Sequence, residues 1–145
     1  MSSLGFDLLD RHVVDGRGDD VACTDASGTL TYARLLERSA ALAGGLRAIG
    51  VGVGDDVAVL VSAGTLRVQV VCACIRLGAV PGDDGHVRIV EGSGGVTVQW
   101  ADEELDLSLV MKAGKTDPAP SLAADSAGYA EAVLSNWPLL NAFSS

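Results

Sequence analysis

The segment from Leu30 to Pro81 constrains the fold of this 145-residue chain more than any other, because two helical patterns flank a buried strand in it. Thr31 stands at an N-cap position, and an apolar stripe at steps of four and three follows it as far as Gly50. The run Asp56 to Ser62 is short, apolar and β-branched, as expected of a strand covered on both faces. We therefore expect an α/β fold with helices packed on a sheet. The helical stripe consists of Leu35, Ser39, Leu42, Leu46 and Ile49.

Glycines and a second apolar segment complete this pattern. Gly44 and Gly45 lie inside the first helix, where each costs about 1 kcal/mol relative to Ala, which indicates either close packing there or a locally soft helix. Leu66 to Leu77 fits a buried helix or a strand by periodicity alone, but its length and the Gly78 stop favour a helix. Strand, helix and the following Ala79-Val80-Pro81 predict a right-handed crossover unit.

The flanking segments predict further elements around this unit. We expect a single domain over residues 1–145, in which residues 82–145 complete a module formed by residues 1–81, with a mixed, partly parallel sheet of about five or six strands. The predicted elements are a helix from Phe6 to Val14 with Phe6, Leu9 and Val13 on one side, a hairpin from Asp19 to Tyr32 with its turn at Asp25 to Gly28, a hairpin from Val87 to Trp100, a strand from Glu104 to Ala113, a linker from Lys115 to Ser121 and a helix from Asp125 to Asn136.

Charge and composition exclude several classes of function. Ten Lys and Arg against 19 Asp and Glu give a formal charge of -9, which repels nucleic acids and anionic membranes. No apolar run reaches the roughly 20 residues that span a bilayer, and the start has no signal peptide, so we expect a cytoplasmic protein. Cys23, Cys72 and Cys74 form no even disulfide framework and are interpreted as small apolar residues.

Short motifs in fixed order link the first half of the chain to a known family. Leu30-Thr31-Tyr32-Ala33 with Leu35, then Ile49-Gly50-Val51, Gly54-Asp55-Asp56, the strand at Val57 to Val61, and Gly78-Ala79-Val80-Pro81 follow one another. In this order and spacing they resemble the N-terminal segment of the adenylate-forming superfamily, which includes acyl-CoA synthetases and AMP-dependent ligases. Arg34 departs from the Glu that is usual after the triplet, so Thr31 must cap its helix without a capping box.

The resemblance implies the N-terminal subdomain fold of acyl-CoA synthetases and ATP-dependent activation of a carboxylate to a thioester. In that family ATP, Mg²⁺ and CoA take part, and the chemistry needs a phosphate loop closed by Lys, a ribose-binding Asp and a C-terminal domain with a catalytic Lys. None of these can be placed on this sequence. We therefore expect a chain truncated before the catalytic motifs, with no catalytic, cofactor-binding or metal-binding residues and no cofactor of its own.

Several segments imitate functional sites but have simpler interpretations. Gly92-Ser93-Gly94-Gly95 with Thr97 is similar to a phosphate loop, yet its flanks alternate like hairpin strands. Gly114-Lys115-Thr116 copies the tail of a P-loop, but Asp117-Pro118 replaces the helix that would follow. The remaining candidates are His12 and His86 as surface or structural residues, Asp102, Glu103 and Glu104 as an acidic turn, and Arg17-Gly18-Asp19 as a turn.

Three aromatic residues outside the family-like segment suggest a contact surface. Trp100, Trp137 and Phe143 either pack over the sheet within the chain or anchor a partner. Three functions remain open from the sequence. The chain is a fragment or truncated homologue of an AMP-forming ligase that is not competent alone, an interaction or dimerisation subunit built on the ligase scaffold, or a non-catalytic module that binds an acyl group or a nucleotide.

Overall fold

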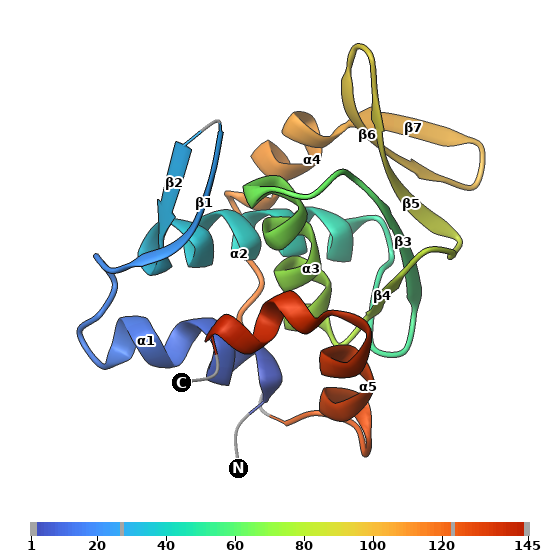
Figure 1. The fold of residues 1–145 in the computed structure, drawn as a ribbon. Coiled ribbons are helices and arrows are strands. Elements are labelled where there is room, and N and C mark those ends of the chain that lie inside the picture. The colour runs from blue at the N-terminus through green and yellow to red at the C-terminus, as the bar shows by residue number, and fades with distance from the viewer. Residues whose placement is uncertain (1–2, 27, 123, 144–145) are drawn as a thin grey trace.

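The computed structural model describes residues 3–26, 28–122 and 124–143, and its largest element is a five-stranded sheet in the order β4-β3-β5-β6-β7 (Figure 1). β4, β3 and β5 run parallel, whereas β5, β6 and β7 are antiparallel. The predicted mixed, partly parallel α/β fold is therefore confirmed. The strands are β3 (Asp56–Leu60), β4 (Val80–Gly82), β5 (Val87–Gly92), β6 (Gly95–Trp100) and β7 (Glu103–Asp106).

The first predicted hairpin forms a separate two-stranded sheet, β1 (Val21–Asp25) with β2 (Gly28–Thr31). One residue of its predicted turn, Ser27, lies outside the described residues. The hairpin stands beside the start of α3 (Thr65–Leu77), where Asp25 Oδ2 accepts a hydrogen bond of 2.7 Å from Thr65 N–H. Asp25 therefore caps a helix that lies far from it in the sequence.

The long helix α2 (Tyr32–Ala48) begins at the predicted cap, where the Thr31 hydroxyl accepts from Arg34 N–H at 3.2 Å. Its glycines face α4 (Leu107–Gly114), and a Cβ built on Gly45 would lie 2.1 Å from Val110 O. The two helices thus touch backbone to backbone. Of the two explanations for the interior glycines, close packing is the one that the structure supports.

The helix α3 is covered on all sides and ends at Gly78, whose φ of 72° belongs to the left-handed region that glycine favours. Cys72 and Cys74 on this helix are both buried. α3 leads directly into β4, which pairs with β3 in parallel. The predicted strand, helix and strand are therefore present in the predicted order.

The predicted strand from Glu104 to Ala113 is wrong beyond its first residues, because β7 ends at Asp106 and α4 follows at once. The alternation of Leu105, Leu107 and Leu109 indicates a strand with one buried face. In the structure the buried positions are Leu107, Val110 and Gly114, which share one face of a helix, while Leu105 and Leu109 are 42 % and 51 % exposed.

The N-terminal helix begins with a π-helical turn, η1 (Phe6–Asp10), and continues as α1 (Arg11–Val14). Its buried face consists of Leu8, Leu9 and His12, so Leu9 is buried as predicted, whereas the other two residues of the predicted face, Phe6 and Val13, are only half-buried. The face is rotated because the π-helical turn holds more residues than an α-helical turn.

The C-terminal part folds back onto the module. α5 (Tyr129–Asn136) is shorter than the predicted last helix, and a 3₁₀ segment, η2 (Pro138–Phe143), follows it. The predicted linker from Lys115 to Ser121 has no regular structure but lies against α2, where Ala119 N–H donates to Ala40 O at 3.0 Å. Within the described ranges, no helix has both the length and the apolar character that crossing a bilayer requires.

Candidate functional site

A cleft with a volume of about 330 Å³ opens at the carboxyl end of β4. A second hollow of about 320 Å³ adjoins it through Gly82, Asp83 and Asn136, and extends over Asp56 and Asp84. In open α/β sheets ligands bind beyond the carboxyl ends of the strands, and the cleft lies at that end of β4, whereas the adjoining hollow lies over the start of β3. The position at the end of β4 makes the cleft the leading candidate site. Its lining residues are Val59, Arg67, Gly82, Asp83, Asn136 and Trp137.

The topology of the sheet explains why a cleft forms there. β4 and β5 pair with opposite sides of β3, so the connection of residues 83–86 crosses the start of β3. Gly85 allows this crossing, because a Cβ there would lie 2.4 Å from Asp56 O. Asp83, the first residue of this connection, is exposed and lines the hollow.

Trp137 forms one wall of the cleft and is held firmly. Its indole Nε1–H donates to Pro81 O at 2.8 Å, and only 7 % of the residue is exposed. Tyr129, at the start of α5, donates its hydroxyl to Ala79 O at 2.5 Å, and burial raises the pKa of that hydroxyl. Two side chains of the C-terminal segment therefore satisfy carbonyl groups next to and within the edge strand β4, which would otherwise lie open.

Arg67 lines the cleft next to Trp137 and carries its positive charge. It lies in the first turn of α3, with its guanidinium carbon 5.0 Å from the centroid of the Trp137 ring, a cation–π contact. Its Nε atom is buried and has no hydrogen-bond partner among the residues that the structure describes. Buried donors are nearly always satisfied in proteins, so this N–H group is an exception within the described chain.

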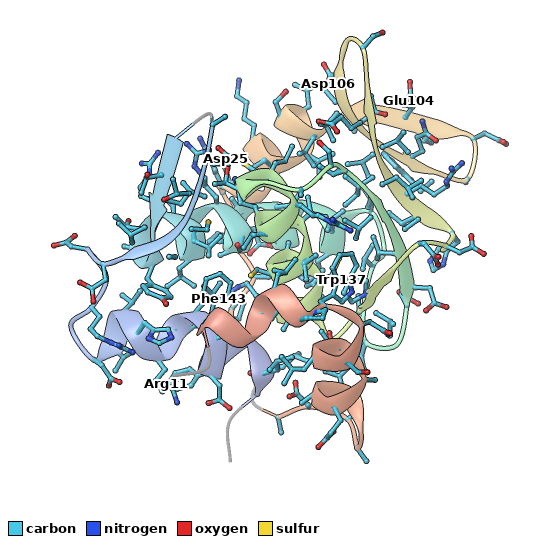
Figure 2. The ribbon with its side chains drawn as sticks, in the orientation of Figure 1. Arg11, Asp25, Glu104, Asp106, Trp137 and Phe143 are labelled. Carbon is cyan, nitrogen blue, oxygen red and sulfur yellow. The ribbon has the colours of Figure 1, made fainter. Side chains whose placement is uncertain are left out.

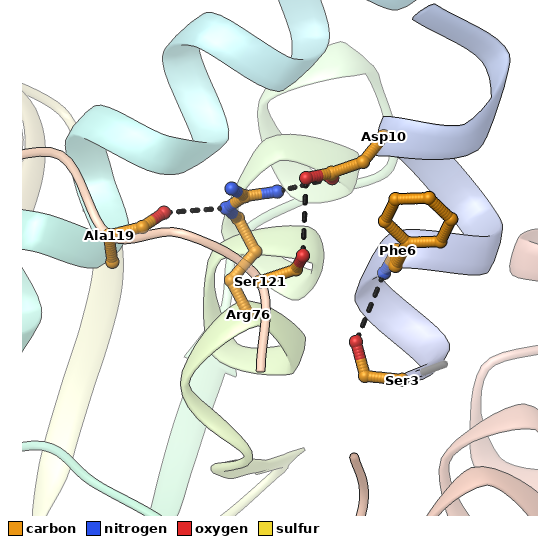
Figure 3. A network of polar contacts seen from close by, with 6 residues as sticks. All are labelled: Ser3, Phe6, Asp10, Arg76, Ala119 and Ser121. Carbon is orange, nitrogen blue, oxygen red and sulfur yellow. Dashed lines mark hydrogen bonds and ion pairs between the residues drawn. The ribbon is translucent and has the colours of Figure 1, made fainter. Parts of the chain in front are cut away.

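A second polar cluster joins the N-terminal helix and α3 to the segment that follows α4 (Figure 3). Arg76 Nη1 is 2.7 Å from Asp10 Oδ1, and Arg76 Nε donates to Ala119 O at 2.9 Å. The Ser121 hydroxyl donates to Asp10 Oδ2 at 3.2 Å. Only 4 % of the Arg76 side chain is exposed, and all of these groups have protein partners. The cluster is therefore structural and ties the segment after α4 to the N-terminal helix.

Neither sequence that imitates a phosphate loop has the geometry of one. Ser93 and Gly94 form the exposed turn between β5 and β6. Gly114 packs against α2, Lys115 N–H donates to Met111 O, and the Thr116 hydroxyl donates to Ala113 O. These groups lie at the carboxyl end of α4, where the helix dipole repels anions. The residues of the β5–β6 turn and of the end of α4 therefore do not fit a nucleoside triphosphate.

The two histidines have different surroundings. His12 is buried, its Nε2 pairs with Phe143 O at 2.7 Å, its Nδ1 pairs with Arg17, and its ring lies 4.2 Å from that of Tyr32. It is the satisfied structural residue that the sequence suggested. His86 is exposed in the connection before β5. The acidic residues Asp102, Glu103 and Glu104 are exposed, but the last two belong to β7 rather than to a turn.

The three aromatic residues of the predicted partner surface lie in different environments. Trp137 and Phe143, both labelled in Figure 2, are 7 % and 3 % exposed and pack within the chain. Trp100 is partly exposed at the end of β6. A contact with a partner through Trp100 stays a prediction.

The sequence did not identify Arg67 or Asn136 as site residues. The available signal was a single Arg in the first turn of an otherwise apolar helix, which alone indicates only a charged helix end. Asn136 gave no signal, because its place beside Asp83 depends on how the C-terminal segment folds back.

Residues 10–82 match the family of AMP-binding enzymes, and these residues make up half of the sequence. The chain belongs to this family. Mouse (Mus musculus) acyl-CoA synthetase short-chain family member 3, mitochondrial, is 33 % identical over 86 residues, which are 55 % of this chain and 13 % of that protein. The acetyl-coenzyme A synthetase of Thiobacillus denitrificans is 37 % identical over 83 residues, which are 54 % of this chain and 12 % of the relative. The aligned part of the chain thus spans about an eighth of the length of these curated relatives.

Solved structures agree with membership of the AMP-binding enzyme family. NpsA-ThdA, an artificially fused adenylation and PCP di-domain from Klebsiella oxytoca, matches with a TM-score of 0.62 and 16 % identity over 85 % of this chain and 27 % of that one. Apo MatB from Rhodopseudomonas palustris matches with a TM-score of 0.50 and 29 % identity over 56 % of this chain and 16 % of that one. The first likeness extends beyond the AMP-binding segment and supports the fold of most of the chain.

The candidate cleft crosses the boundary of the AMP-binding segment. Arg67 and Gly82 lie within residues 10–82, whereas Asp83, Asn136 and Trp137 lie after them. The cleft therefore exists only because the C-terminal segment packs onto the part of the chain that matches the family.

Proposed function

We propose that this chain is an N-terminal scaffold segment of an AMP-forming, acyl-CoA synthetase-like ligase and that it does not adenylate a carboxylate by itself. The observation that carries the proposal is the structure of Gly114, Lys115 and Thr116, the segment most similar to a phosphate loop. Their polar groups end a helix and their glycine packs on α2, so they offer nothing to a triphosphate. Membership of the family supports the ligase origin.

The packing of residues 83–145 supports a structural role for this half. α4 covers α2 through glycine contacts, α5 covers β4 through Tyr129 and Trp137, and Arg76 fixes the segment between these helices. The helices α4 and α5 and the segment between them therefore each bury a surface of the AMP-binding segment. We propose that it stabilises the scaffold and does not supply catalytic groups.

Pyrophosphate exchange tests this proposal. The purified chain, with Mg²⁺ and ATP, is incubated with labelled pyrophosphate and a panel of short, medium and aromatic carboxylates. We expect exchange at the level of a reaction without protein, while a full-length acetyl-coenzyme A synthetase run in parallel gives a strong signal. Carboxylate-dependent exchange by this chain would refute the proposal.

A second candidate function is an accessory subunit, and the β7 edge favours it. β7 ends the sheet order, all four of its residues are exposed, and Glu103, Glu104 and Asp106 make this edge acidic (Figure 2). Pairing with a second copy would place these carboxylates near one another, which is unfavourable. We therefore expect a different protein with Lys or Arg along an extended segment, rather than a homodimer.

Light scattering after size exclusion tests this candidate. We expect the chain alone to be monomeric at low ionic strength. A stable dimer that persists in high salt would contradict the argument from charge. The free thiols suit a reducing compartment, so the proposed location for either function is the cytoplasm.

A further inference from the structure

The cleft at the end of β4 contains a positive group that the rest of the chain leaves available. The described ion pairs join Arg34 to Glu37, Arg47 to Asp117 and Arg76 to Asp10, and none of them includes Arg67. Arg67 instead lies over the Trp137 ring with its Nε buried and unsatisfied within the described chain. A planar guanidinium that lines a cleft is suited to a carboxylate, which accepts two parallel hydrogen bonds.

The adjoining hollow has the opposite charge. Asp56, Asp83 and Asp84 all line it, and no Lys or Arg is among its lining residues. A phosphate or a dicarboxylate at Arg67 would share its cleft with Asp83 and would lie beside the hollow that Asp56 and Asp84 line, which costs Coulomb energy. An ammonium group at the same place would be stabilised by them.

We infer that the cleft binds a small aminocarboxylate, with its carboxylate on Arg67 and its ammonium group beside Asp83. The volume of about 330 Å³ is at the lower end of the range for small-molecule sites, which fits a ligand of this size. Asn136 adds an amide that can donate to the ligand carboxylate or accept from its ammonium group. This inference does not depend on the proposed scaffold role, since it concerns binding and not adenylation.

The binding groups are already in position. Arg67 is carried by α3, whose first turn is capped by Asp25, and Trp137 is fixed by its bond to Pro81 O. Little ordering is then required when the ligand enters, which favours affinity. A purely structural role of Arg67, stacking on Trp137 without any ligand, is the alternative that the experiment must separate.

The test uses 5-aminopentanoate as the probe, with pentanoate, pentylamine and inorganic phosphate as comparison ligands, in calorimetric titrations of the whole chain. We expect saturable binding of 5-aminopentanoate, at least tenfold tighter than binding of pentanoate or pentylamine. Tighter binding of phosphate, equal binding of the four compounds, or no saturable binding of 5-aminopentanoate would overturn the inference.

Two substitutions assign the charges. Arg67→Met should weaken binding of 5-aminopentanoate at least tenfold, which is about the loss of one charge-assisted hydrogen bond. Asp83→Asn, at an exposed position where folding is not at risk, should weaken binding of 5-aminopentanoate and strengthen binding of pentanoate, because it removes a carboxylate that attracts the ammonium group and repels the ligand carboxylate. Arg88→Met, at an exposed position on β5, is the matched control and should bind like the unmodified chain. Unchanged affinity in both Arg67→Met and Asp83→Asn would show that the stacking alone explains Arg67.

Discussion

A methyl group added at Gly114 tests the contact between α2 and α4. An ideal Cβ at this position lies 1.6 Å from Ala41 O and 2.6 Å from Gly45 N, well below the 3.4 Å at which ordinary contact begins. Both atoms belong to the backbone of α2, so no side-chain rotation relieves the overlap. The Gly114→Ala chain must separate the helices or lose the last turn of α4.

Two opposing effects determine the magnitude. Alanine is favoured over glycine by about 1 kcal/mol inside a helix. Overpacking costs about 1–3 kcal/mol where side chains can adjust, and more where backbones must move. Separating the helices also uncovers Val110 and Leu107, which are 3 % and 6 % exposed, and full exposure of either costs about 1.5–3 kcal/mol. With partial exposure of both, we expect a net loss of about 3 kcal/mol in the free energy of unfolding.

Urea unfolding followed by tryptophan fluorescence measures this loss. The control is Gly94→Ala, in the exposed hairpin turn, where an added Cβ meets no atom within 4 Å. We expect the control to stay within about 0.5 kcal/mol of the unmodified chain. If Gly114→Ala is as stable as the control, or more stable, the backbone contact between α2 and α4 is refuted.

Three further predictions concern other parts of the core. Arg76→Met leaves the mostly buried carboxylate of Asp10 without its ion pair and should cost about 3–5 kcal/mol in urea unfolding, and an unchanged midpoint would contradict the junction in Figure 3. Burial raises the pKa of the Cys72 and Cys74 thiols from 9.0 to about 12, so above pH 9 only the unfolded chain ionises them. The free energy of unfolding should then fall between pH 9 and 12, by up to about 1.4 kcal/mol per pH unit for each thiol, and a double Ala variant should show a smaller fall. Asp25→Ala removes the cap of α3 and should lower the free energy of unfolding by about 1 kcal/mol in urea unfolding. An unchanged free energy of unfolding would contradict the hydrogen bond between Thr65 N–H and Asp25.

The regular elements of the AMP-binding segment could be predicted from local patterns. α2 follows a complete stripe from its Thr31 cap, and β3 is a short β-branched run between glycine-rich turns. The interior pair Gly44 and Gly45 is compatible with either close packing or a locally soft helix from the sequence alone, and the contact with α4 decides for close packing. In these cases sequence and tertiary structure favour the same local conformation.

The C-terminal half was harder to predict, since its structure depends on distant contacts. Residues 104–113 fit a strand pattern through alternating leucines, yet the glycine contacts with α2 favour a helix from Leu107 onward. The sequence around Tyr129 and Trp137 contains no pattern that predicts their hydrogen bonds to the carbonyl groups of Ala79 and Pro81. The cleft could not be predicted for the same reason, because Arg67 and Asn136 are brought together only by this long-range folding.

Binding of Mg·ATP to the isolated chain tests the central claim most directly. Equilibrium dialysis with labelled nucleotide, at millimolar concentration and low ionic strength, reports binding whether or not any carboxylate reacts. With no phosphate-binding geometry at Gly92–Gly95 or Gly114–Thr116, and with three aspartates lining the hollow beside the cleft at the end of β4, we expect no saturable binding. Saturation at one nucleotide per chain would contradict the account.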